Sequence, residues 1–163
     1  MTRPTADRLR QLNIDRLVLQ TINNIETYGL AIIGVMGDDG IHAPLTYTAG
    51  MAESDLPEMM LSGVLPMHAH TLLNDTYAAV KDGKASLDVG SRIEGIVANG
   101  ITLVVCAGLP NHMANIARSI YGFHVQVVQL IYPDLAGHYP WDEGYDLDPA
   151  VQGDAFATPE AFL

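Results

Sequence analysis

The chain has 163 residues, a usual length for one domain, and 48% of them are hydrophobic against 17% charged. It contains no uninterrupted run of about 18 apolar residues, so the composition excludes both a membrane-spanning helix and a disordered chain. The formal net charge of −11 repels phosphate backbones and anionic membrane surfaces, so we expect neither nucleic acid nor a membrane as a partner.

Two further expectations come from the N-terminal segment and from the single cysteine. Residues 1–7 lead into a charged helical pattern, where a secretion signal would need a continuous apolar segment, and this predicts a cytoplasmic protein. The single cysteine, Cys106, lies within an apolar run, which excludes an intrachain disulfide and favours a small core residue over a reactive thiol.

The first half of the chain predicts two helices and three strands. Residues 6–28 carry apolar side chains at helical spacing, and Gly29 ends this amphipathic helix. Two apolar runs, 30–36 and 44–50, flank a glycine- and aspartate-rich turn and are typical of a hairpin, and 56–63 is typical of a third strand. A second helix is expected to begin at Pro66 and to end at Gly83.

The second half predicts strands over 86–96 and 100–108, a helix over 110–121 and a buried strand over 123–132. Because strands occur in groups and do not alternate strictly with helices, the order indicates an α+β fold, a single domain with a mixed or mainly antiparallel sheet flanked by helices. We expect this domain to span 29–150, with helix 1–28 packed on it and an acidic tail over 151–163. The first helix is apolar on more than one side, which favours a homo-oligomer.

Three segments carry a resemblance to a known family. They are Leu45 to Met51 together with Leu56-Pro57-Glu58, then Leu72-Leu73-Asn74, and finally Gln129 to Trp141. Together they resemble the bacterial family called domain of unknown function 4262 over about residues 28–150, with mild departures from its pattern at Ala49, Met51, Tyr132 and Tyr139. The resemblance implies a fold and a set of marked positions, but no reaction.

The first group of marked positions lies where the second strand ends and the third begins. Tyr47, Thr48 and Gly50 come at a strand end, where a glycine permits close approach of a ligand or another backbone. One interpretation is structural, with Thr48 and Glu58 hydrogen-bonded to backbone at the turn. The other is functional, with this loop as one wall of a binding cleft and Glu58 as an acid, base or anchor.

Four other polar or aromatic positions have two interpretations each. Asn74 lies inside a helix and either pins a neighbouring loop or orients a ligand. Gln129 interrupts an apolar strand and is either a structural clamp or the polar floor of a pocket. Asp134 follows Pro133 and either organises a turn or acts as a catalytic group, and Trp141 either seals the sheet or stacks on a ligand.

The sequence lacks the motifs of nucleophilic catalysis and of nucleotide binding, and its metal-binding signal is weak. No serine lies in a nucleophile-elbow frame and no glycine run has the spacing of a nucleotide cradle, so no nucleotide cofactor is implied and the cofactor is unassigned. His68 and His70 are weak metal candidates, because positions i and i+2 of a helix point in different directions.

Three functional hypotheses follow. The first is a small-molecule-binding protein or enzyme with a cleft between the Tyr47–Glu58 loop and the Gln129–Trp141 segment, with Glu58 and Asp134 as catalytic candidates. The second is a non-enzymatic interaction or accessory module in which the same residues serve only the fold. The third is a histidine-based metal-binding protein.

Overall fold

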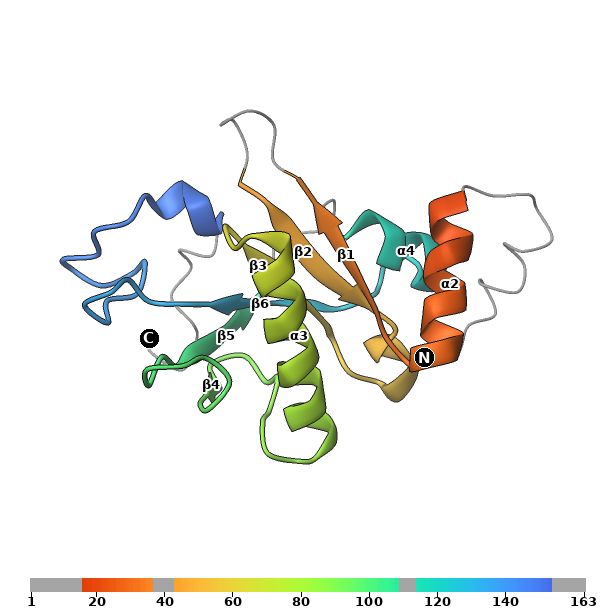
Figure 1. Cartoon of the computed structure of the whole chain (residues 1–163), viewed down its shortest axis with the longest axis horizontal. Coiled ribbons are helices and arrows are strands. Elements are labelled where there is room, and N and C mark those ends of the chain that lie inside the picture. Colours follow the sequence, from red (N-terminus) through yellow and green to blue (C-terminus); the bar gives the residue numbers. More distant parts are fainter. Residues whose placement is uncertain (1–15, 37–42, 109–113, 154–163) are drawn as a thin grey trace.

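The structure, a computed structural model, describes residues 16–36, 43–108 and 114–153 (Figure 1). In chain order the elements are α2 (Arg16–Tyr28), β1 (Ala31–Val35), β2 (Leu45–Ala49), the short 3-10 helix η1 (Met51–Ser54), β3 (Glu58–Ser62), α3 (Pro66–Lys81), β4 (Arg92–Ile93), β5 (Leu103–Ala107), α4 (Asn115–Tyr121), β6 (Val127–Ile131) and the 3-10 helix η2 (Pro149–Gln152).

The described strands form one six-stranded sheet in the order β1-β2-β3-β6-β5-β4. All neighbouring strands are antiparallel except β3 and β6, which are parallel, with Glu58 beside Val127 and Met60 beside Gln129. The sequence-based prediction of an α+β fold with a mixed sheet is therefore confirmed.

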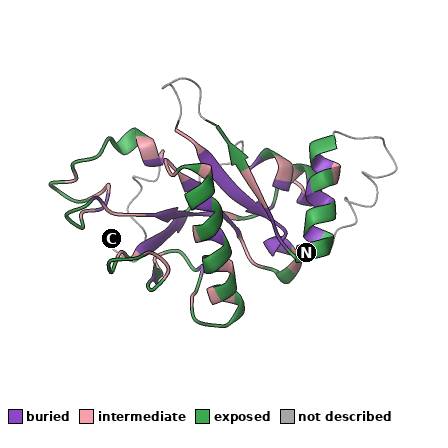
Figure 2. Ribbon diagram, viewed as in Figure 1, coloured by how far each residue is buried: buried purple, intermediate pink, exposed green. Residues whose placement is uncertain are grey.

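Alternation along the strands divides the core into two layers, one on each face of the sheet. Figure 2 shows that the central strands are buried along most of their length. On one face, Tyr47 and Met60 pack with Ile22 of α2 and Ile120 of α4. On the other face, the neighbouring strand residues pack against α3, in a cluster that includes Met59, Leu61, Leu73, Val105 and Leu130. Strands β2, β3 and β5 are buried along most of their length, and β5 is apolar throughout, whereas β2 and β3 include buried polar side chains.

A third apolar cluster covers β5 and β6. Val104, Cys106 and Ile131 pack there with Tyr139, and Trp141 lies against them. Cys106 is 2% exposed and burial raises the pKa of its thiol to about 11, so the prediction of a core cysteine is confirmed.

Several element boundaries differ from those predicted. Residues 86–96 form turns and only the two-residue strand β4, because Gly90 and Gly95 adopt positive φ angles that break an extended run. Strand β6 begins at Val127 and not at Phe123. The predicted tail begins within η2, in which Gln152 is fully buried. The predicted helical residues 6–15 and 110–113, and tail residues 154–163, lie outside the described part.

None of the helices in the described ranges is both long and apolar enough to cross a membrane.

Candidate functional site

The Glu58 carboxylate is fully buried and surrounded by hydrogen-bond donors from the preceding loop. Its Oε2 accepts from the Thr48 hydroxyl at 2.7 Å, and its Oε1 accepts from the backbone N–H groups of Gly50 at 2.9 Å and Ala52 at 3.1 Å. Thr48 Oγ1 also accepts from the Met59 N–H at 2.9 Å. Glu58 thus satisfies N–H groups at the start of η1, which have no partner within so short a helix.

Gly50 is required by the geometry of this loop. Its φ is 121°, and a Cβ at this position would lie 2.9 Å from the carbonyl oxygen of Gly29. A side chain would therefore strain the backbone and push β2 away from the end of α2. The close approach predicted from the sequence is to backbone, not to a ligand.

Burial raises the pKa of Glu58 to about 7, while the Thr48 hydroxyl and the N–H groups of Ala52, Gly50 and Met51 oppose the rise. The protonation of this carboxyl therefore changes near neutral pH. Because Glu58 has no exposed surface, it acts on its surroundings through the loop that it holds.

Tyr47 links the sheet to α4. Its hydroxyl oxygen accepts a hydrogen bond from the Ile116 N–H at 3.2 Å, and its side chain is 2% exposed. Burial raises its pKa above the ordinary value, so the phenol stays neutral and acts as a packing and capping group.

Gln129 holds the C-terminal segment. Its Nε2 donates to the Gln152 carbonyl oxygen at 2.6 Å. The Gln152 side chain then closes the arrangement by accepting from the Tyr132 N–H at 3.1 Å and donating to the Tyr132 carbonyl oxygen at 2.8 Å. Both glutamines are buried, so this geometry matches the structural clamp and not the floor of an open pocket.

Asp134 organises the turn after β6. Its Oδ1 accepts from the N–H groups of Ala136 at 3.0 Å and His138 at 2.8 Å, and its Oδ2 accepts from the Asp146 N–H at 3.1 Å. Burial would raise the pKa of the Asp134 carboxyl, but these donors together with the nearby His138 outweigh that effect and lower it. The group is held ionised in a turn, as the structural interpretation expects.

The remaining sequence candidates lie at the surface or in a separate cluster. Trp141 stacks on Tyr139 with ring centroids 5.2 Å apart and planes 4° apart. Asn74 is exposed on α3, where its Nδ2 lies 3.1 Å from His70 Nδ1, and His68 is exposed on the same helix. Within the described ranges, no three histidine, cysteine, aspartate or glutamate side chains are placed to hold a metal ion.

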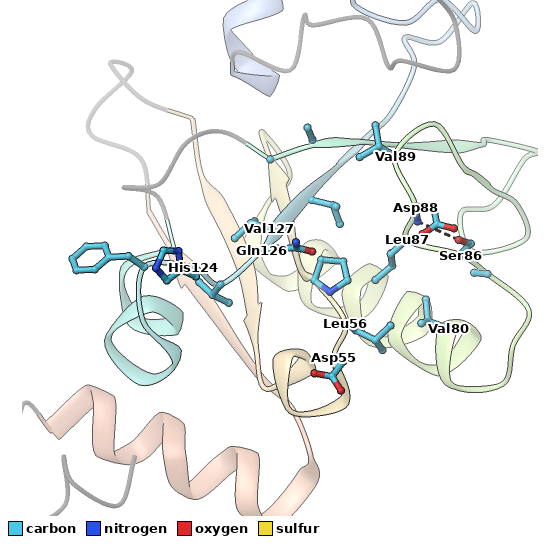
Figure 3. A pocket seen from close by; sticks show the side chains of 17 residues that line it. Asp55, Leu56, Val80, Ser86, Leu87, Asp88, Val89, His124, Gln126 and Val127 are labelled. Atoms are coloured by element: carbon cyan, nitrogen blue, oxygen red, sulfur yellow. Dashed lines mark hydrogen bonds between the residues drawn. The ribbon is translucent and has the colours of Figure 1, made fainter. Parts of the chain in front are cut away.

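A cleft of about 830 Å³ lies near the point where β3 and β6 begin and β5 ends (Figure 3). Its walls come from three segments, 55–57, 85–89 and 123–128, together with Val80, Ala107 and Gly108. A second hollow of about 240 Å³ adjoins it and shares Asp55, Leu56, His124 and Gln126.

Glu58 connects two walls of this cleft without lining it. Its side chain holds the start of the loop that continues to residues 55–57, and its backbone N–H donates to the Gln126 carbonyl oxygen at 2.8 Å. Tyr47, Gln129, Asp134 and Trp141 do not line the cleft. Of the loop predicted as one wall of a cleft, residues 47–58, only 55–57 line this cleft, and no residue of the predicted second wall, 129–141, lines it.

Sequence reasoning missed segments 85–89 and 123–128. The first was expected to be a strand, and the second was included in a buried strand. The available signal was the pair of polar residues His124 and Gln126, which interrupt the apolar run 123–132 and are exposed in the cleft.

Fold and site together define a small α+β domain in which a buried carboxylate supports the loop beside a surface cleft. The sequence model for the family described as Domain of unknown function (DUF4262) matches residues 24–146. The match covers most of the chain, so the chain belongs to this family. No curated protein and no solved structure shows significant similarity to the chain.

Proposed function

We propose that the chain is a small-molecule-binding protein and that its site is the cleft between residues 55–57, 85–89 and 123–128. The observation that carries this proposal is the cleft itself. Its volume of about 830 Å³ falls within the range of about 300–1,000 Å³ usual for ligand pockets. Apolar side chains such as Leu56, Val80 and Leu87 lie beside the polar groups of Asp55, His124 and Gln126, as in sites that bury a ligand body and orient its polar ends.

The anchoring of the walls supports the proposal. Asp55, Leu56 and Pro57 follow the η1 helix that Glu58 holds, and the Glu58 N–H donates to the Gln126 carbonyl oxygen, which joins this wall to the 123–128 wall. On the third wall, Leu87 is 6% exposed and packs into the α3 side of the core. A site with walls held in this way loses little conformational entropy when a ligand binds.

Filling the cleft tests the proposal. Gln126 is exposed and lines both hollows, so in Gln126→Trp the larger side chain occupies ligand space without removing a core contact. Thr71→Trp places the same ring on an exposed turn of α3 outside the cleft and is the matched control. We expect fragments detected by ligand-observed NMR with the wild-type protein to bind Thr71→Trp equally and to lose at least about tenfold in affinity for Gln126→Trp.

Circular dichroism and thermal unfolding of both variants check that the fold is intact. Fragments that bind Gln126→Trp as well as the wild-type protein would place the binding site elsewhere. A library that gives no hits with the wild-type protein would contradict the proposal altogether.

A further inference from the structure

Two carboxyl side chains and one imidazole line the cleft. They are Asp55, Asp88 and His124, and the described lining contains no lysine and no arginine. The two aspartates come from different walls, Asp55 from the end of η1 and Asp88 from the segment after α3. In Figure 3 the apolar side chains of Leu56, Val80 and Leu87 lie between them.

Backbone hydrogen bonds fix the position of both aspartates. Asp55 has a left-handed φ of 56°, and its N–H donates to the Ala52 carbonyl oxygen at 3.1 Å. The Asp88 N–H donates to Ser86 Oγ at 3.1 Å, and its carbonyl oxygen accepts from the Ser91 N–H at 2.9 Å. The backbone at both aspartates is therefore held in ordered turns, at separate points around the apolar side chains of the cleft.

The charge of the cleft selects among ligand classes. Carboxylates in a concave, partly apolar site concentrate cations and repel anions, and the net charge of −11 adds a field of the same sign. A phosphate or carboxylate ligand would meet no cationic partner from lysine or arginine among the described lining residues. An apolar ligand body suits the floor formed by Leu56, Val80 and Leu87.

We propose that the cleft takes a small organic cation, an amine or amidine attached to an apolar body. This inference rests on the proposed function and names the ligand class of the same site. The apolar body lies on the floor, and the cationic group lies within reach of Asp55 or Asp88.

Three probes with the same apolar body and different charge test this inference. They are phenethylamine, phenethyl alcohol and phenylacetate, titrated separately into the wild-type protein by NMR at low and at moderate ionic strength. We expect the amine to bind about fivefold tighter than the alcohol and the carboxylate to bind weakest, because exposed ion pairs contribute modestly. The preference for the amine should shrink as salt is added.

Two double variants separate local from long-range charge. Asp55→Asn with Asp88→Asn removes both lining carboxylates, and asparagine tolerates the left-handed backbone at position 55. Asp75→Asn with Glu94→Gln removes the same charge from exposed positions outside the lining. The first pair should bring the amine-to-alcohol affinity ratio close to one, and the second should leave it as in the wild-type protein.

The outcomes distinguish the two proposals. Equal binding of the three probes, blocked by Gln126→Trp, would overturn the ligand class and leave the cleft as a binding site. A preference for phenylacetate, or an amine preference that survives the loss of both lining aspartates, would also overturn the class. Binding of none of the probes at millimolar concentration would overturn the class and the proposed function together.

Discussion

At the scale of single residues, Glu58 shows how a carboxylate singled out from sequence serves a site without entering it. The sequence left open whether Glu58 is a cleft acid, base or anchor, or a hydrogen-bond partner for backbone. The contacts in the structure are those of the second interpretation, because both carboxylate oxygens accept hydrogen bonds from the loop, from the Thr48 hydroxyl and from the N–H groups of Gly50 and Ala52. These contacts position the cleft wall that follows, at residues 55–57.

The raised pKa of Glu58 predicts a pH-dependent stability. Burial moves the folded-state pKa to about 7 from an ordinary value of 4.5, so the folded state holds this proton more tightly than the unfolded state. The contribution of the protonated group to stability is complete below pH 4.5 and is lost as the pH rises through 7. From the size of the pKa shift, we expect this one group to lower the free energy of unfolding by about 3 kcal/mol between those limits.

Urea denaturation of the wild-type protein and Glu58→Gln at several pH values isolates this effect. Glutamine keeps one oxygen for the η1 N–H groups, offers its amide to Thr48, and does not titrate, so the difference between the two proteins reports Glu58 alone. We expect the wild-type protein to lose stability relative to the variant as the pH rises. Parallel pH profiles would mean that the pKa of Glu58 is the same in the folded and the unfolded state, and would contradict the raised pKa.

For the buried polar residues, the sequence predicts that a hydrogen-bond partner is needed but not which distant residue supplies it. That Gln129 needs a hydrogen-bond partner follows from its position in an apolar strand. That the partner is Gln152 could not be predicted, because the two residues are distant in the chain and Gln152 belongs to a segment expected to be a tail. The role of Asp134 was easier to predict, since its hydrogen-bond partners lie mostly within its own turn.

At the scale of elements, η2 is attached to the ends of β3 and β6, which are distant from it in sequence. Ser62 donates through its hydroxyl to the Val151 carbonyl oxygen at 2.8 Å, and the Tyr132 hydroxyl donates to the Ser62 carbonyl oxygen at 3.0 Å. With the contacts between Gln129 and Gln152, these hydrogen bonds make η2 part of the folded domain.

Gln152→Ala tests the attachment of η2. The substitution leaves the N–H and carbonyl oxygen of Tyr132 without their buried side-chain partner, so we expect a loss of about 2–3 kcal/mol in the free energy of unfolding. Gln126→Ala truncates a glutamine that is exposed and should change stability by less than about 0.5 kcal/mol. Chemical denaturation of both variants gives the comparison, and equal effects would show that the side-chain hydrogen bonds of Gln152 contribute nothing to stability.

Element prediction succeeded where the apolar pattern was long and failed where glycines interrupted it. The runs 30–36, 44–50, 56–63 and 100–108 each contain a strand of the sheet, and Pro66 begins a helix as expected. The predicted strand 86–96 is mostly turns, because positive φ angles at Gly90 and Gly95 cannot continue an extended strand. Because of this error, the sequence did not predict that residues 85–89 line the cleft.

At the scale of the whole molecule, the strand order creates the cleft. Because β3 and β6 are parallel neighbours, the segments that lead into them meet at the same edge of the sheet. Strand β5 is antiparallel to β6, so its carboxyl end arrives there too. The sequence predicted a mixed sheet but not this order, since pairing between strands distant in the chain depends on packing of the whole core.

Backbone amide chemical-shift mapping tests whether the cleft near the start of β3 and β6 binds small molecules. Isotope-labelled protein would be titrated with phenethylamine and with phenethyl alcohol, which share one apolar body. We expect saturable shifts at residues 55–57, 85–89 and 123–128, with little change in the 132–141 segment. Shifts confined to 129–141, or no saturable shifts in either titration, would show that this cleft is not the binding site.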